Sequence, residues 1–286
     1  GHLGRAATNA PDAQSLADCA ARATRAAEAA GASTPELAYP GFPAPEPARP
    51  HHGHDSATAA LDPDRGGDAL HEAFEDAREH GVEAHGIWTA AEEERAVATR
   101  AGTARDLTTH ALMKVICIAP GGRSGFASTV GVSEGDVSGT GVTSRAATKA
   151  RSDGPVVELP PGEYPVVMEP RAVATLLELL GETALDGLAY ADGSGAWVGH
   201  LGEQVAAPAV NLADSPFSPR TLPRAFDAEG TSKRPLPLIQ DGVARNVVHD
   251  RHSAALAGAE STGHALAPGG DPDGPRPRNL VLAGGG

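Results

Sequence analysis

The sequence predicts an α+β protein, in which an N-terminal α/β domain is followed by a mostly antiparallel, β-rich C-terminal domain. Three observations support this prediction. Stretches with helical periodicity occur in the first 80 residues, and runs rich in β-branched and apolar residues follow between residues 82 and 119. Farther along, Asp241-Gly242 separates two apolar runs, which is the strongest short-range signal for a β-hairpin.

The N-terminal domain is expected to span residues 1–154, and the C-terminal domain residues 155–286. The boundary is placed where Asp153-Gly154-Pro155 opens a linker. Residues 39–67 are rich in Pro, Gly, Asp and His and show no periodicity, so they are predicted to form a disordered loop. A chain of 286 residues is long enough for two domains of ordinary size.

Periodicity and terminal residues define the elements of the first domain. Apolar residues at helical spacing predict helices, and runs of β-branched and apolar residues predict strands, with a turn at Gly102. The predicted helices cover residues 12–30, 68–80 and 141–151, and the predicted strands cover residues 82–88, 95–100 and 107–119.

In the second domain, residues 165–168 are apolar on both faces and predict a short central strand. A helix follows from Glu169-Pro170, with proline in its first turn, and ends at Gly181. Its apolar stripe consists of Val173, Leu176, Leu177 and Leu180. Pro235 and Pro237 cannot donate hydrogen bonds, so the first strand of the Asp-Gly hairpin is expected to be short or to lie at a sheet edge.

Charge and composition exclude several classes of protein. The net charge of −14 argues against a nucleic-acid-binding protein, because phosphate binding needs clustered Lys and Arg. There is no run of about 18 apolar residues that would span a membrane. We therefore expect a cytoplasmic protein without nucleic-acid or membrane partners. Cys19 and Cys117 are too few for a disulfide framework or a zinc ribbon, and both are expected to be buried.

The segment from Ala225 to Thr231 carries two acids and a glycine, which predict a turn before the hairpin. Its sequence, Phe-Asp-Ala-Glu-Gly-Thr, resembles the signature of the TldD/PmbA family, zinc-metalloprotease subunits once called modulators of DNA gyrase. In that family the pattern reads D-x-E-G-T, a strand, and E-N-G-hydrophobic, and Asp241 stands here where Asn is usual. Further matching segments are Gly162–Tyr164, Gly202–Val205, Ser261–His264 and Pro277–Leu280.

The resemblance also implies what the chain lacks. In the catalytic TldD-type subunits, a helix with the motif H-E-x-x-x-H binds zinc. Glu178 and Glu182 stand about where the two histidines would be, and Leu179, which cannot accept a proton, stands where the glutamate would be. This matches the PmbA (TldE-like) branch, so no catalytic residue, metal ligand or cofactor is expected in this chain. Comparison with the family also predicts missing sequence at both ends.

The implied function is that of a non-catalytic subunit of a heteromeric zinc protease that acts on small or unfolded peptides. The implied partner is a TldD-type paralogue that carries the zinc, in a heterodimer or a larger assembly. The residues expected to line the substrate cleft are Phe226, Asp227, Glu229, Gly230 and Asn279. An equally supported interpretation is that residues 227–230 are a tight turn that only shapes the sheet.

Two other functions stay open, and each depends on a weaker signal. An autonomous metal-dependent hydrolase could use His71 with Glu75, or Glu178 with Glu182, although charged residues on a solvated helix face are the simpler interpretation. The second of these functions is that of an interaction or regulatory protein without a proteolytic role. The histidines of residues 51–55 are more simply a solvated tract than a metal site, and His249, His252 and His264 show no spacing that links them to a nucleophile.

Overall fold

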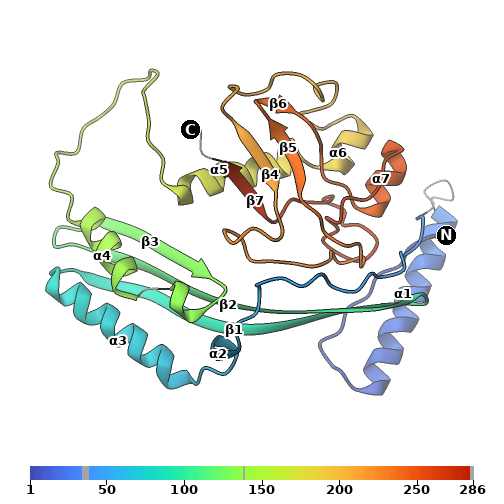
Figure 1. Ribbon diagram of the computed structural model, residues 1–286, viewed down its shortest axis with the longest axis horizontal. Coiled ribbons are helices and arrows are strands. Elements are labelled where there is room, and N and C mark those ends of the chain that lie inside the picture. The colour runs from blue at the N-terminus through green and yellow to red at the C-terminus, as the bar shows by residue number, and fades with distance from the viewer. Residues whose placement is uncertain (34–38, 138, 284–286) are drawn as a thin grey trace.

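The computed structural model describes residues 1–33, 39–137 and 139–283. Helices and antiparallel sheets make the fold α+β, as the sequence predicts (Figure 1). A three-stranded sheet with the order β1-β2-β3 belongs to the first half of the chain, and a four-stranded sheet with the order β6-β5-β4-β7 belongs to the second. None of the helices within the described ranges has the length and apolar character needed to cross a membrane.

The helices of the first half are α1 (Ala13–Ser33), α2 (Ser56–Ala59), α3 (Pro63–Glu79) and α4 (Gly139–Ala150), with a 3₁₀ turn at Glu134–Asp136. Three of them, α2, α3 and α4, pack on the three-stranded sheet, whereas α1 lies near the far tip of the β1–β2 hairpin (Figure 1). Helix α3 begins earlier than predicted because Asp62 caps it, accepting a 2.7 Å hydrogen bond from the Asp64 N–H, and Pro63 occupies its first turn. Gly66 lies inside this helix, where an added methyl group would meet the Trp88 ring at 2.9 Å.

Residues 39–67 differ from the predicted disordered loop. They include α2 and the start of α3, and the remainder runs as extended chain beside the long hairpin (Figure 1). The Gly53 carbonyl accepts a 2.8 Å hydrogen bond from the Thr109 N–H, and Tyr39 is buried. The polar composition predicted a disordered loop, but hydrogen bonds to the sheet hold this segment in a defined conformation.

The hairpin consists of β1 (Glu83–Thr99) and β2 (Gly102–Ile118), and β3 (Ser124–Gly131) pairs with the second half of β2. The two strands predicted over residues 82–88 and 95–100 are therefore one continuous strand. Glutamates 92–94 interrupt the apolar pattern, but their side chains remain about half exposed while their backbone pairs with β2. The turn predicted at Gly102 is confirmed.

The two halves of this hairpin bury opposite faces. From Thr109 to Cys117 the odd-numbered residues of β2 are mostly buried, and they pack under α4. From Ala104 to Thr108 the even-numbered residues are buried instead, and Ala104 packs with Ala225 and Phe226 of the C-terminal half. Because side chains alternate along a strand, one ribbon thus contributes to two separate cores. Cys117 is buried as predicted, whereas Cys19 is only half-buried.

The C-terminal half contains a small sheet covered by short helices. Its elements are α5 (Pro170–Thr183), α6 (Gly187–Asp192), β4 (Asn211–Asp214), β5 (Leu236–Gln240), β6 (Val243–Ala244), α7 (Arg251–Ala257) and β7 (Leu280–Ala283). The predicted Asp-Gly hairpin is confirmed, with positive φ at both Asp241 and Gly242. The first strand is short, as predicted, and Pro237 is accommodated beside a register shift in β4.

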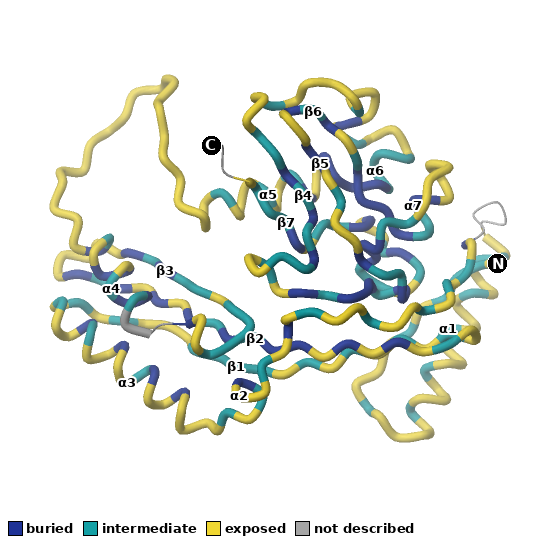
Figure 2. Tube along the Cα trace, in the orientation of Figure 1, coloured by how far each residue is buried: buried dark blue, intermediate teal, exposed yellow. Residues whose placement is uncertain are grey.

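The strand predicted over residues 165–168 is absent, and that prediction is wrong. Residues 151–169 form an exposed connection without regular structure between α4 and α5 (Figure 2). Val167 is fully exposed and Val166 is 70% exposed, because no other strand of the described chain lies beside them. The helix after it begins at Pro170 as predicted, but Leu177 and Leu180 pack against the core while Leu176 remains half exposed.

Candidate functional site

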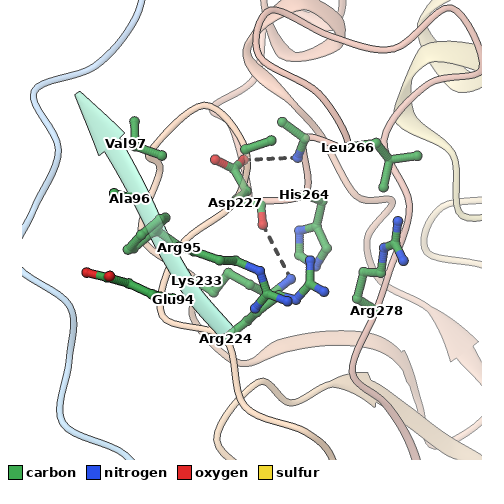
Figure 3. Close-up of a pocket in the computed structure, with 14 residues that line it drawn as sticks. Glu94, Arg95, Ala96, Val97, Arg224, Asp227, Lys233, His264, Leu266 and Arg278 are labelled. Carbon is green, nitrogen blue, oxygen red and sulfur yellow. Dashed lines mark hydrogen bonds between the residues drawn. The ribbon is translucent and has the colours of Figure 1, made fainter. Parts of the chain in front are cut away.

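A cavity of about 450 Å³ lies between the outer half of β1 and the loops of the C-terminal half (Figure 3). A cavity of this size suits a small ligand or a short piece of peptide. Charged side chains enter it from both halves of the chain. Its lining residues are Glu94, Arg95, Ala96, Val97, Arg224, Phe226, Asp227, Ala228, Lys233, Gly263, His264, Ala265, Leu266 and Arg278.

Asp227 organises the turn at one wall of this cavity. Its Oδ1 accepts hydrogen bonds from the backbone N–H groups of Glu229 and Thr231, and its Oδ2 accepts one from the Ala265 N–H, each at 2.9 Å. Burial raises the pKa of Asp227, although these bonds favour the ionised carboxylate. Gly230 completes the turn with a φ of +86°. Asp227 therefore joins two loops by hydrogen bonds, in agreement with the turn interpretation, while it also lines the cavity.

Glu229 points away from the cavity and into the protein. Its Oε1 accepts a 2.7 Å hydrogen bond from the Tyr39 hydroxyl, and its Oε2 accepts a 2.9 Å bond from the Arg251 N–H at the start of α7. Burial raises the pKa of Glu229 to about 7, against the effect of these two bonds. Burial and the hydrogen bond to Glu229 also raise the pKa of Tyr39. This residue fastens the N-terminal segment to α7 and is not placed to touch a ligand in the cavity.

A buried charged cluster lies behind the cavity lining, where Asp214 pairs with the lining residues Lys233 and His264. Asp214 is fully buried, and its Oδ1 lies 3.5 Å from the Lys233 Nζ and 3.2 Å from the His264 Nε2. Its Oδ2 accepts hydrogen bonds from the N–H groups of Arg278 at 2.8 Å and Asn279 at 2.9 Å. Burial alone would raise the pKa of Asp214, but these partners outweigh it and hold the pKa below its usual range. Asp214 is therefore the ionised centre that Lys233 neutralises.

His264 cannot serve as a general base in this arrangement. Its Nδ1 lies 2.9 Å from the Thr262 Oγ1, and its Nε2 faces Asp214, so neither ring nitrogen points to a ligand. Burial lowers the pKa of His264, and the Lys233 charge acts in the same direction. His249 is likewise engaged, with its Nδ1 3.1 Å from the Ser253 Oγ in the buried cap of α7. These histidines therefore have packing roles.

Positive side chains dominate the open side of the cavity. Figure 3 shows Arg95, Arg224 and Lys233 converging beside His264, with Arg278 approaching from the other side. Arg95 pairs with Glu93 on its own strand. Burial lowers the pKa of Arg224, and the neighbouring charges of Arg95 and Arg278 add to this effect. The cavity is therefore suited to a negatively charged group.

The predicted cleft residues divide between the cavity and its support. Phe226 and Asp227 line the cavity. Gly230 lies behind the turn, where a methyl group would meet the Val97 Cγ1 at 3.0 Å. Asn279 is buried, and its Nδ2 donates a 2.8 Å hydrogen bond to the Leu222 carbonyl. With Glu229 also turned inward, three of the five residues shape the site and do not line it.

The other candidate pairs do not form a catalytic centre. The His71 Nε2 lies 3.8 Å from the Glu75 Oε1 on the exposed face of α3. Glu182, near the end of α5, lies beside Arg276 from the C-terminal loop region. His51 is buried, with its Nε2 2.7 Å from the Asp106 Oδ1 and its Nδ1 accepting from the Gly53 N–H. Across the described residues, no group of three or more His, Cys, Asp or Glu is arranged to hold a metal ion.

Sequence reasoning missed most of the charged residues of this site. Asp214, Lys233 and Arg278 come from three segments that only the folded sheet brings together, and no motif spacing links them. No motif pointed to Asp106 either. Its Oδ2 accepts a 2.9 Å hydrogen bond from the Ala225 N–H, and this bond connects the hairpin to the Asp227 turn. The one available signal was Lys233, which stands two residues after the D-x-E-G-T pattern.

Comparison with known proteins gives a consistent result. The PmbA/TldA metallopeptidase C-terminal domain matches residues 161–286. A protein named as a metalloprotease from Methanothermobacter thermautotrophicus is 29% identical over 113 residues, which are 39% of this chain and 25% of that protein. A metalloprotease TldD homolog from Haemophilus influenzae is 28% identical over 145 residues, which are 50% of this chain and 30% of that protein. The chain thus aligns with between a quarter and a third of these relatives' length.

Solved structures share the fold. TldE from Thermococcus kodakarensis superimposes with a TM-score of 0.85 at 24% identity, covering 100% of this chain and 66% of that chain. A suggested modulator of a DNA gyrase from Thermotoga maritima MSB8 gives a TM-score of 0.81 at 23% identity, covering 93% and 61%. At these identities the similarity establishes the fold.

Proposed function

Because the chain belongs to the PmbA/TldD family of metallopeptidase-related proteins, we propose that it is a non-catalytic, TldE-like subunit of a cytoplasmic heteromeric zinc protease. The proposed substrates are small or unfolded peptides. The proposal is supported by the sequence of α5, where the family resemblance puts Glu178, Leu179 and Glu182 about where the residues of the zinc motif would be. The activity, substrates and partner of the longer relatives enter here as parts of this proposal.

The side chains of α5 do not fit a catalytic zinc. Such a metal needs three protein ligands and a group that activates its water, usually a carboxylate. Leu179 cannot accept a proton, and its side chain is 56% exposed. Glu178 and Glu182 are exposed, and Glu182 lies 3.7 Å from the Arg276 Nη1. The zinc of the proposed enzyme would therefore belong to a partner with the H-E-x-x-x-H motif.

An exposed apolar surface supports a role as a subunit. It is formed by the connection before α5 and by the outer side of α5. Its members and their exposed fractions are Val156 (88%), Val157 (64%), Leu159 (66%), Val166 (70%), Val167 (103%), Met168 (46%), Leu176 (50%) and Leu179 (56%). Large exposed apolar side chains are typical of interaction sites, and an unpaired extended segment can add to a partner's sheet. We call this surface the apolar connector and assign the partner to it.

Co-purification tests the proposal directly. The chain would be expressed with and without a zinc-motif paralogue, and each product analysed for zinc, size and peptide cleavage. We expect zinc near zero per chain when the protein is expressed alone and dialysed against trace metal. We also expect a stable complex with the paralogue that cleaves peptides faster than the paralogue alone. One zinc per chain retained after dialysis, or a paralogue that is equally active by itself, would refute the proposal.

Variants of the apolar connector locate the interface. Replacing Val166 and Val167 with Asp puts two charges on the proposed contact surface and is expected to abolish co-purification. Leu16→Asp is the matched control, because Leu16 is 52% exposed on α1, outside this surface. Circular dichroism would check that all variants fold. Undiminished complex formation by the double variant would place the partner elsewhere.

A further inference from the structure

The cavity carries positive charge that its own carboxylates do not neutralise, in a chain whose net charge is −14. Four cations line it, against two lining carboxylates, Glu94 and Asp227. Both carboxylates are already engaged. Asp227 accepts three backbone hydrogen bonds, and the Glu94 Oε1 lies 3.2 Å from the Arg105 Nη1. Behind the lining, Asp214 is already paired with Lys233 and His264.

Two guanidinium groups make no direct contact with a carboxylate of the described residues. Among the described residues, the side chains of Arg224 and Arg278 form no hydrogen bond and no ion pair, and only the backbone N–H of Arg278 is bonded. Arg224 is partly buried and lies within the electrostatic reach of Arg95 and Arg278. The Glu93 and Asp106 carboxylates offset this repulsion only from a distance, without a direct contact. Like charges held together at low solvent exposure raise the free energy of the empty site, and a bound anion would lower it.

The residues around the two guanidinium groups indicate which kind of anion the cavity would bind. A guanidinium presents a planar pair of N–H donors that matches the two oxygens of a carboxylate. Val97, Phe226 and Leu266 line the same cavity and offer apolar contact next to the charged groups. An apolar side chain beside a carboxylate would satisfy both parts of the lining, whereas a bare inorganic anion would leave the apolar part uncovered.

We propose that the cavity binds a carboxylate group of a peptide, with Arg224 and Arg278 as its principal ligands and Arg95 beside them. The inference rests on the proposed peptide-binding role and adds the chemical group that is recognised. That carboxylate is either the C-terminus of a peptide or the side chain of Asp or Glu next to an apolar residue.

Fluorescence anisotropy with three labelled pentapeptides tests the proposal on the full chain alone. The first probe is Gly-Ser-Gly-Ala-Leu with a free C-terminus, the second is the same peptide amidated, and the third is amidated Gly-Ser-Gly-Glu-Leu. We expect the first or the third to bind at least about tenfold more tightly than the second, and to weaken as salt is raised. Tight binding of the first identifies a C-terminal carboxylate, and tight binding of the third identifies an acidic side chain.

Variants separate a binding role from a structural one. Arg224→Gln and Arg278→Gln are expected to lose at least about tenfold in affinity for the carboxylate probe. The control Arg220→Gln removes the same charge from an exposed residue outside the cavity and is expected to bind like the wild type. Because the Arg224 side chain forms no hydrogen bond or ion pair with the described residues and is partly repelled by Arg95 and Arg278, Arg224→Gln is expected to keep the Tm of the ligand-free protein, whereas loss of a structural arginine would lower it.

Three results would overturn the inference. They are equal affinities for the acid and amide probes, unchanged binding by both cavity variants, and stabilisation by inorganic phosphate through Arg224 without binding of any peptide. These measurements need neither zinc nor a partner. If the chain binds carboxylate peptides but no paralogue, only the proposed subunit role is refuted. If it binds a paralogue but no carboxylate peptide, only the carboxylate site is refuted.

Discussion

Glu229 is fully buried, and burial raises its pKa from 4.5 to about 7. Between these two values the folded state binds more protons than the unfolded state at this residue. The free energy of unfolding therefore falls as pH rises from about 4.5 to about 7 and is not reduced further above that. The effect is opposite to that of a carboxylate whose pKa is depressed on folding.

Glu229→Gln should remove this pH dependence, because the amide is neutral at every pH and nearly the same size. Relative to the variant, we expect the wild type to lose up to about 3 kcal/mol of unfolding free energy between about pH 5 and about pH 8. Urea unfolding of both proteins across this range would measure the difference. A constant difference across the range would contradict the prediction.

Lys233 neutralises Asp214 where neither side chain reaches solvent, since they are 2% and 0% exposed. Lys233→Met keeps most of the volume but leaves Asp214 buried without its counter-charge. We expect a loss of about 3–5 kcal/mol in unfolding free energy. Lys114→Met is the control, because Lys114 is exposed on β2, and it should change stability by less than about 0.5 kcal/mol. Similar values for the two variants would show that the ion pair contributes little.

The residues that could be predicted are those in local patterns. The acids and glycine around Asp227 indicated the turn, because short acids bond nearby backbone N–H groups, and the structure contains those bonds. Asp214 and Lys233 could not be paired in advance, because their contact depends on how separate strands pack. The direction of Glu229 was also unpredictable, since its partner Tyr39 lies 190 residues away in sequence.

At the scale of elements, close approach depends on glycine and alanine. A methyl group on Gly125 of β3 would overlap the Ala146 carbonyl oxygen and lie 2.6 Å from the Ala150 backbone nitrogen in α4. Gly125→Ala should therefore push helix and sheet apart and cost about 1–3 kcal/mol. Gly67→Ala is the counterpart in α3, where no atom would lie within 4 Å, and it should stabilise by about 0.5–1 kcal/mol. Chemical denaturation of both variants would check these opposite signs.

The elements predicted well are those whose pattern alone determines them. The Asp-Gly hairpin and the start of α5 at Pro170 follow from turn and cap chemistry. Residues 165–168 carry a strand pattern but have no neighbouring strand in this chain, so tertiary context decides against it. The continuity of β1 was missed because Glu92–Glu94 look like an interruption, although a two-stranded ribbon leaves such side chains in water.

At the scale of the whole molecule, residues 151–169 join the two halves as an exposed segment without regular structure (Figure 1). A Glu-specific protease should cleave the isolated chain first after Glu158 or Glu163, because a protease needs an accessible extended segment. Mass spectrometry would identify the two fragments. Binding of the proposed partner to the apolar connector should slow this cleavage. First cleavage within α3 or the hairpin would contradict the prediction.

The β1–β2 hairpin also limits which insertions and deletions this chain can tolerate. Arg95 reaches the cavity in the register that pairs it with Asp106, and Asp106 holds both His51 and the Ala225 N–H. Losing one residue between Trp88 and Arg95 would turn Arg95 to the opposite face, whereas losing two would restore its direction. A deletion of two residues in this ribbon is therefore expected to preserve the direction of Arg95, whereas a deletion of one residue is expected to alter ligand recognition.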